Sequence, residues 1–158
     1  MKKITYLSWK DIEESCKVLT KKLLYSSCKF DAIISIQRGG CIPGVLLSHL
    51  LYISEFYSIG IRTTSSEKIN ASRLEQTILL NTSDLVNIRD KNVLIIDDVI
   101  NTGNTLQIAL NEVLKFKPSI CKTAVLVWDG DNSYIYKVDY FARRTPGWVV
   151  FPWEHPEK

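Results

Sequence analysis

Three short apolar runs constrain the fold of this chain more than any other feature of its sequence. They occupy residues 32–36, 93–96 and 122–127 and are rich in isoleucine and valine. Runs of this length and composition are typical of strands that are buried on both faces. Helix-like stretches at 43–51 and 104–115 follow the first two runs. The alternation predicts an α/β fold, in which helices flank both faces of a mostly parallel sheet.

The remaining elements complete this pattern. Ser8 followed by Asp11 resembles the start of a capped helix, and apolar residues then recur at helical spacing as far as Leu23. Further strands are predicted at 56–61, 77–80, 138–141 and 148–151. Residues 62–76 are polar and without periodicity, which predicts a long loop between two of these strands.

Composition limits the classes of function. The chain has 158 residues, 46% hydrophobic and 23% charged, with no internal repeat, so we expect a single domain over residues 1–158. The net charge is +3 and the basic residues are scattered, which argues against nucleic-acid binding. No apolar run approaches the length of a membrane span. We therefore expect a cytoplasmic location and no association with a membrane. The four cysteines form no CxxC pair, which favours reduced core residues over a zinc site.

The segment VLIIDDVINTGNTL, residues 93–106, is the strongest functional signal. A predicted buried strand leads into Asp97 and Asp98, and a short polar segment then precedes a predicted helix. In open parallel sheets, ligands bind at this end of the strands. Residues 102–105 are small or hydroxylated, so their backbone N–H groups and the helix N-terminus can surround a phosphate.

The acidic pair needs a different ligand, because carboxylates repel a phosphate. Asp97 and Asp98 suit the hydroxyls of an attached sugar or a divalent metal ion. The segment matches neither the GxxxxGK[ST] pattern nor the GxGxxG pattern, which excludes the usual nucleoside-triphosphate and dinucleotide loops. A phosphate pocket beside a carboxylate pocket indicates a sugar phosphate as ligand.

Three segments together resemble one enzyme family, the type I phosphoribosyltransferases. Residues 93–106 resemble the family's signature for phosphoribosyl pyrophosphate (PRPP). The segment IQRGGCIPG, residues 36–44, is similar to its pyrophosphate loop, and GWVVFPWE, residues 147–154, is similar to the base-binding segment of the xanthine-guanine and hypoxanthine branch. The segments occur in the family's order over nearly the whole chain.

The resemblance implies a purine salvage enzyme that uses PRPP, a free purine base (xanthine, guanine or hypoxanthine) and Mg2+. It implies a catalytic group of Asp97, Asp98 and Asn101, and a metal site at Asp98 and Glu154. The implied PRPP-binding residues are Arg38, Gly39, Asp97, Asp98, Asn101, Thr102, Gly103, Asn104 and Thr105. Trp148 would stack on the base and Val149 would offer its backbone to the base edge. Residues 62–76 would form a flexible hood, and the chain would form a homodimer or homotetramer.

Two positions depart from the family pattern. Asn101 stands where purine enzymes of this family usually have an Asp that handles a proton of the base, and an amide cannot accept that proton. The rate is then lowered, the base needs less help, or the residue is an engineered replacement. Asp129 stands near the place of a Lys that contacts an exocyclic oxygen, so it would accept a hydrogen bond from an exocyclic amine of the base instead.

Two other classes of protein share parts of this pattern. A strand ending in two aspartates also occurs in response-regulator receiver domains, but the Arg38–Gly39–Gly40 loop and the phosphate-binding segment have no place in that fold. The second alternative is a catalytically weak relative that senses PRPP or nucleotides and regulates expression. Asn101 and the missing Lys favour this sensor, whereas the acidic pair, the Arg-Gly-Gly loop and Trp148 favour the enzyme.

Overall fold

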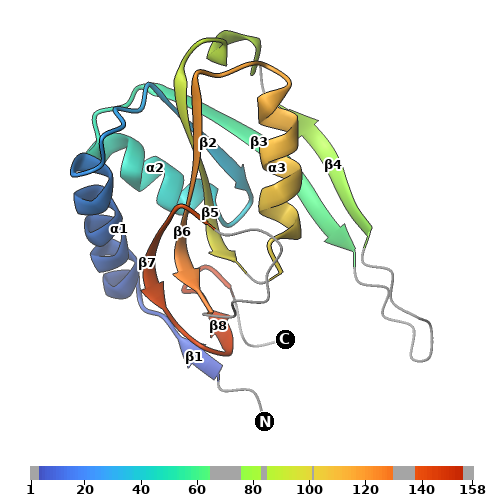
Figure 1. Ribbon diagram of the computed structural model, residues 1–158. Helices are drawn as coiled ribbons and strands as arrows, with labels where there is room; N and C mark the ends of the chain where they lie inside the picture. Colours follow the sequence, from blue (N-terminus) through green and yellow to red (C-terminus); the bar gives the residue numbers. More distant parts are fainter. Residues whose placement is uncertain (1–3, 65–75, 83–84, 101, 130–137, 155–158) are drawn as a thin grey trace.

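The computed structural model describes residues 4–64, 76–82, 85–100, 102–129 and 138–154. The elements in chain order are β1 (Ile4–Tyr6), α1 (Trp9–Leu24), β2 (Ala32–Gln37), α2 (Cys41–Leu50), β3 (Glu55–Thr64), β4 (Gln76–Thr82), η1 (Leu85–Ile88), β5 (Asn92–Ile100), α3 (Asn104–Leu114), β6 (Ile120–Trp128), β7 (Tyr140–Arg144) and β8 (Trp148–Val150). The predicted fold class is confirmed: helices flank a mostly parallel sheet (Figure 1).

The main sheet has six strands in the order β4-β3-β2-β5-β6-β7. All neighbours are parallel except β3 and β4, which are antiparallel and carry a register shift between Gly60 and Ile61. The chain builds outward from β2 through β3 to β4, and then returns to place β5 on the other side of β2. The loops after β2 and β5 therefore diverge at a topological switch point, where parallel sheets bind their ligands.

The helices bury the two faces of this sheet in separate cores. α1 and α2 cover one face, where Leu19 and Leu47 pack against Ile33 and Leu94. α3 and η1 cover the opposite face, and Leu106 is among the α3 residues buried there. The central strands β2 and β5 are buried on both faces, because both cores draw on them, which explains their mostly apolar sequences before the acidic pair.

α1 begins where the sequence predicts. Ser8 is the N-cap: its hydroxyl accepts from the Asp11 amide (3.2 Å), and the Asp11 carboxylate accepts from the Ser8 amide (2.8 Å). This reciprocal capping box satisfies backbone groups that a helix end leaves unpaired. It also holds the pKa of Asp11 down at about 2, chiefly through the hydrogen bonds from Ser8.

A second, two-stranded sheet joins the beginning and the end of the described chain. β1 runs parallel to β8, with Ile4 opposite Trp148 and Tyr6 opposite Val150. The Leu7 amide extends the pairing by donating to the Val150 carbonyl (2.9 Å). β1 was not predicted, because three residues are too few to establish a periodicity.

Several predicted boundaries are wrong. β5 continues four residues past the predicted end, and α2 begins two residues earlier than predicted. The predicted loop at 62–76 is strand at both ends, where β3 runs through Thr64 and β4 starts at Gln76; residues 65–75 lie outside the described residues. β7 begins two residues after the start of the strand predicted at 138–141.

The cysteines agree with the prediction of unpaired thiols. Cys16 is buried, and burial raises its pKa to about 12, whereas Cys28, Cys41 and Cys121 are partly buried. Within the described ranges, no group of three or more His, Cys, Asp or Glu side chains gathers as a metal cluster would. None of the described helices combines the length and apolar character needed to cross a bilayer.

Candidate functional site

The acidic pair lies inside β5 rather than after it. Asp97 pairs in register with Val125 of β6, so its backbone belongs to the sheet. The Asp97 side chain is 8% exposed, and that of Asp98 is partly exposed. An Asp97 carboxylate oxygen accepts from the Asp98 amide (2.9 Å), and an Asp98 oxygen accepts from the Val99 amide (2.8 Å). These bonds orient both carboxylates at the switch point between β2 and β5.

Both carboxyl groups of the pair have raised pKa values. Burial, reinforced by the neighbouring Asp98, raises the pKa of Asp97 well above its usual value. Burial also raises the pKa of Asp98 to about 6, and Glu154 adds to this increase. Among the residues that the structure describes, neither carboxylate has a Lys, Arg or His ion-pair partner. A bound cation would remove this electrostatic cost.

The loop after β2 packs directly on the acidic pair. The peptide bond between Gln37 and Arg38 is cis, and the carbonyls of Arg38 and Gly39 accept hydrogen bonds from the first amides of α2. A Cβ atom on Gly39 would overlap the Asp98 carboxylate. A Cβ on Gly40 would approach the Ile36 and Ile96 carbonyl oxygens to 2.7 and 2.6 Å. At Gly40 only glycine allows this approach, because the Cβ would meet backbone atoms, whereas at Gly39 it would displace the end of the Asp98 side chain.

The N-terminus of α3 has the geometry of an anion site. Gly103 is the N-cap in the left-handed region, with φ of 85°, and its carbonyl accepts from the Gln107 amide (2.9 Å). No acidic residue lies in the first turn of α3, so its positive partial charge is not offset there. Thr102 is exposed and its hydroxyl lies 3.4 Å from the Asn104 amide. Asn101 lies outside the described residues.

The predicted base-binding segment is β8 and the turn that follows it. The Trp148 side chain is 57% exposed, whereas Val149 is 9% exposed and belongs to the core under α1. A Glu154 carboxylate oxygen accepts from the Phe151 amide (2.9 Å), which closes the turn. Glu154 also contributes to the raised pKa of Asp98, the other predicted metal ligand.

Asp129 lies at the end of β6, the same end of the sheet as the acidic pair. It is partly buried and follows Trp128, whose ring packs against Phe141 (5.0 Å between ring centroids). The Arg144 guanidinium lies over the Trp128 ring, 5.3 Å from its centroid. These contacts hold the Trp128 ring in place at this end of β6.

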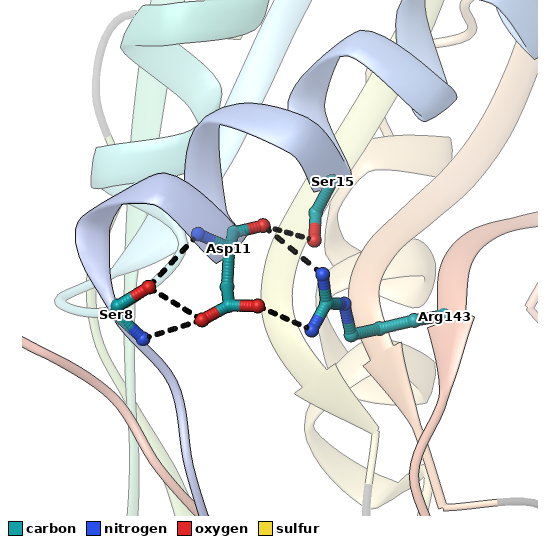
Figure 2. A network of polar contacts seen from close by, with 4 residues as sticks. All are labelled: Ser8, Asp11, Ser15 and Arg143. Atoms are coloured by element: carbon teal, nitrogen blue, oxygen red, sulfur yellow. Dashed lines mark hydrogen bonds and ion pairs between the residues drawn. The ribbon is translucent and has the colours of Figure 1, made fainter.

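Sequence reasoning missed the residues that tie α1 to β7 and to the segment after β8. Figure 2 shows the Arg143 side chain of β7 donating to the Asp11 carboxylate (3.2 Å) and to the Asp11 carbonyl (3.3 Å). The Ser15 hydroxyl donates to the same carbonyl (2.6 Å). Trp9 at the start of α1 contacts Trp153 (5.9 Å between ring centroids). The Ser8–Asp11 motif was visible in the sequence, but its distant partner on β7 leaves no sequence signal.

Known proteins with similar sequences and structures show which family the chain belongs to. A model of the phosphoribosyl transferase domain matches residues 5–158. The "Phosphoribosyltransferase domain-containing protein 1" of Xenopus laevis is 36% identical over 82 residues, which cover 51% of this chain and 37% of that protein. The chain therefore matches little more than a third of this curated relative's length.

Two solved structures match almost the whole chain. A purine phosphoribosyltransferase from Pyrococcus horikoshii is 33% identical, with a TM-score of 0.80, over 96% of this chain and 94% of the other. A protein from Neisseria gonorrhoeae with bound ppGpp is 26% identical, with a TM-score of 0.86, over 99% of this chain and 92% of the other. Together with the family model, these matches show that the chain belongs to the phosphoribosyl transferase domain family.

Proposed function

We propose that the protein transfers the 5-phosphoribosyl group of PRPP to a free purine base, giving a nucleoside monophosphate and pyrophosphate. The observation that carries the proposal is the contact of Gly39 with the Asp98 carboxylate, next to the uncompensated N-terminus of α3. This arrangement offers separate places for the pyrophosphate, the ribose and the 5′-phosphate of one PRPP molecule. The match to the purine enzyme from P. horikoshii supports the class of base.

The reaction breaks the bond from the ribose C1 to the pyrophosphate oxygen and forms a bond from C1 to a base nitrogen, which loses its proton. The transition state is a cationic sugar like that of other glycosyl transfers. Asp97 and Asp98 hold the ribose hydroxyls, and their negative charge stabilises this cation. Thr102, Gly103, Asn104 and Thr105 bind the 5′-phosphate at the α3 N-terminus, while Arg38 and Gly39 bind the pyrophosphate.

The acidic pair also fits Mg2+, because two adjacent carboxylates lie near the end of β5 and carboxylate oxygens are the ligands that this ion prefers. Asp98 and Glu154 would hold the ion. When bound, Mg2+ neutralises charge on the leaving pyrophosphate. Deprotonation of Asp98 is a condition for binding, so Mg2+ affinity should rise with pH through about 6.

The base lies on Trp148, whose exposed ring is available for stacking. Val149 offers backbone groups to the base edge, and Asp129 accepts from an exocyclic amine, which favours guanine over hypoxanthine. We also propose one domain over residues 1–158, a homodimer or homotetramer, and a cytoplasmic location. Sedimentation measures the oligomer, and fluorescence microscopy of a tagged chain measures the location.

The second candidate is a weakly catalytic sensor of PRPP or nucleotides. Asn101 motivates it, since an amide cannot take a proton from the base. The N. gonorrhoeae relative with bound ppGpp supports nucleotide binding by this fold.

One assay separates the two candidates. The chain is incubated with PRPP and Mg2+ and, in turn, with guanine, xanthine, hypoxanthine, adenine and a pyrimidine, and pyrophosphate release is followed. Turnover with a 6-oxopurine supports the enzyme, whereas PRPP binding by calorimetry without turnover on any base supports the sensor. Trp148→Ala should raise the KM for the base by about fivefold, because stacking contributes about 1 kcal/mol. Phe116→Ala is the control for loss of an aromatic ring away from this site, because Phe116 lies two residues after α3 and packs against the core under that helix.

A further inference from the structure

The outer face of the small β1–β8 sheet carries a patch of exposed apolar side chains. Ile4 and Tyr6 are 55% and 65% exposed, and Trp148 is 57% exposed. Successive residues of a strand point to opposite faces, so partners in register share a face. Ile4 is the register partner of Trp148, and both therefore lie on the solvent face, opposite the buried Val149.

This patch lies beside the proposed reaction site. In Figure 1 the arrowheads of β5 and β6 point toward the end of the molecule where β1 and β8 lie. Trp9, whose ring contacts Trp153 after β8, lines one surface hollow together with Cys41 and Ile42, which directly follow the Arg-Gly-Gly loop. Exposed apolar side chains grouped at such a place mark a binding surface.

We propose that Ile4 forms the second half of the platform for the purine base and so helps to determine specificity for planar aromatic bases. Neighbouring strands lie about 5 Å apart, so register partners on one face have about this spacing, and a purine ring is wider than that. A base stacked on Trp148 then also covers the Ile4 side chain and removes it from water. The inference rests on the proposed function, because it assumes that Trp148 carries the base.

The platform is fixed before any base arrives. Three contacts tie the N-terminal segment to the C-terminal one: the Leu7 amide to the Val150 carbonyl, the Trp9 ring to Trp153, and the Asp11 carboxylate to Arg143 (Figure 2). Trp153 is itself stacked on Phe151 at 4.7 Å, with the planes 11° apart. Because these contacts hold β1 against β8, Ile4 is preorganised for the base.

The test compares two nearly isosteric variants, Ile4→Val and Ile4→Thr. Both keep a β-branched side chain that suits a strand, but threonine replaces a methyl group by a hydroxyl. We expect Ile4→Thr to raise the KM for guanine by about fivefold, from the loss of half-buried apolar surface. The kcat and the KM for PRPP should stay within about twofold, and Ile4→Val should behave like the wild type. Ile120→Thr is the matched control. Ile120 is 38% exposed at the start of β6, at the opposite end of the main sheet from the acidic pair.

The outcomes separate this inference from the proposed function. Turnover by the wild type with an unchanged guanine KM in Ile4→Thr overturns the inference alone. An equal change in KM for Ile4→Val also overturns the inference, because it indicates a role of Ile4 in the strand. A change of sedimentation mass without a change in KM overturns it too, because it indicates a role in a subunit interface. If the wild type does not turn over, calorimetry with GMP replaces the kinetic assay. Weaker GMP binding by Ile4→Thr alone supports the platform, and equal binding by both variants and the wild type overturns it. No GMP binding by the wild type overturns both proposals.

Discussion

Gly39 and Gly40 are adjacent, yet the same substitution should have opposite consequences at the two positions. A Cβ on Gly39 meets the end of the Asp98 side chain, which can rotate away. A Cβ on Gly40 meets backbone on two central strands, at 2.6 Å from the Ile96 oxygen and 2.9 Å from the Asp97 Cα. Gly39→Ala should therefore affect ligand binding, and Gly40→Ala should affect folding.

The sizes follow from the atoms displaced. Gly39→Ala moves the Asp98 carboxylate away from the proposed places of the ribose and the metal ion, and so removes its hydrogen bond to the ribose. A hydrogen bond to a charged group contributes about 1.5–3 kcal/mol, so PRPP affinity in Mg2+ should fall by about 10-fold to 100-fold. The melting temperature should hardly change. Gly40→Ala overpacks the sheet by about 1–3 kcal/mol, which lowers the melting temperature by about 2–12 °C in a chain of this size.

Calorimetry with PRPP and thermal unfolding measure the two effects on the same samples. Asp98→Asn is the reference for lost binding without added volume. If Gly39→Ala binds PRPP as the wild type does, the contact between this loop and Asp98 has no role in binding. If Gly40→Ala melts as the wild type does, the loop is not packed on the sheet as described.

Three further predictions concern other parts of the molecule. Because folding raises the pKa of Asp98 to about 6, protonation of this carboxyl group stabilises the folded state at low pH, and that stability is lost as the pH rises through about 6. In denaturant unfolding, Asp98→Asn should thus be more stable than the wild type at about pH 8 and not at about pH 4. Equal differences at both pH values would contradict this. Ser8→Ala removes the α1 cap and should lower the free energy of unfolding by about 1 kcal/mol; an unchanged urea midpoint would show that water replaces the cap. Asn101→Asp should raise kcat for guanine or hypoxanthine at least about tenfold, with less gain for xanthine and little change in PRPP affinity, and a flat kcat for every base would favour the sensor.

The sequence predicts the layered fold because its main elements have local causes. β2 and the first part of β5 are mostly apolar runs, and the Ser8–Asp11 box starts α1, so each can be predicted from a few adjacent residues. The acidic pair and the Arg-Gly-Gly loop are likewise local motifs. Their proximity follows from topology, since both come after central parallel strands.

Contacts between distant segments were beyond the reach of these patterns. The pairing of β1 with β8 and the bond from Arg143 to Asp11 join the two ends of the described chain. Neither leaves a periodicity, and a single arginine on a strand has no preferred partner in the sequence. The predicted end of β5 was early because carboxylates usually mark a loop, whereas here the sheet continues through them.

The β1–β8 pairing has a consequence for how the protein is made. Its partners are about 140 residues apart, so closing this loop costs more chain entropy than most contacts in the sheet. During synthesis, β1 leaves the ribosome early and has no partner until β8 has been translated. The central sheet can assemble first from nearer segments, and the surface around Trp148 is then the last part to form. A truncated chain that ends before residue 148, once released from the ribosome, should therefore contain a folded sheet and an unpaired first strand.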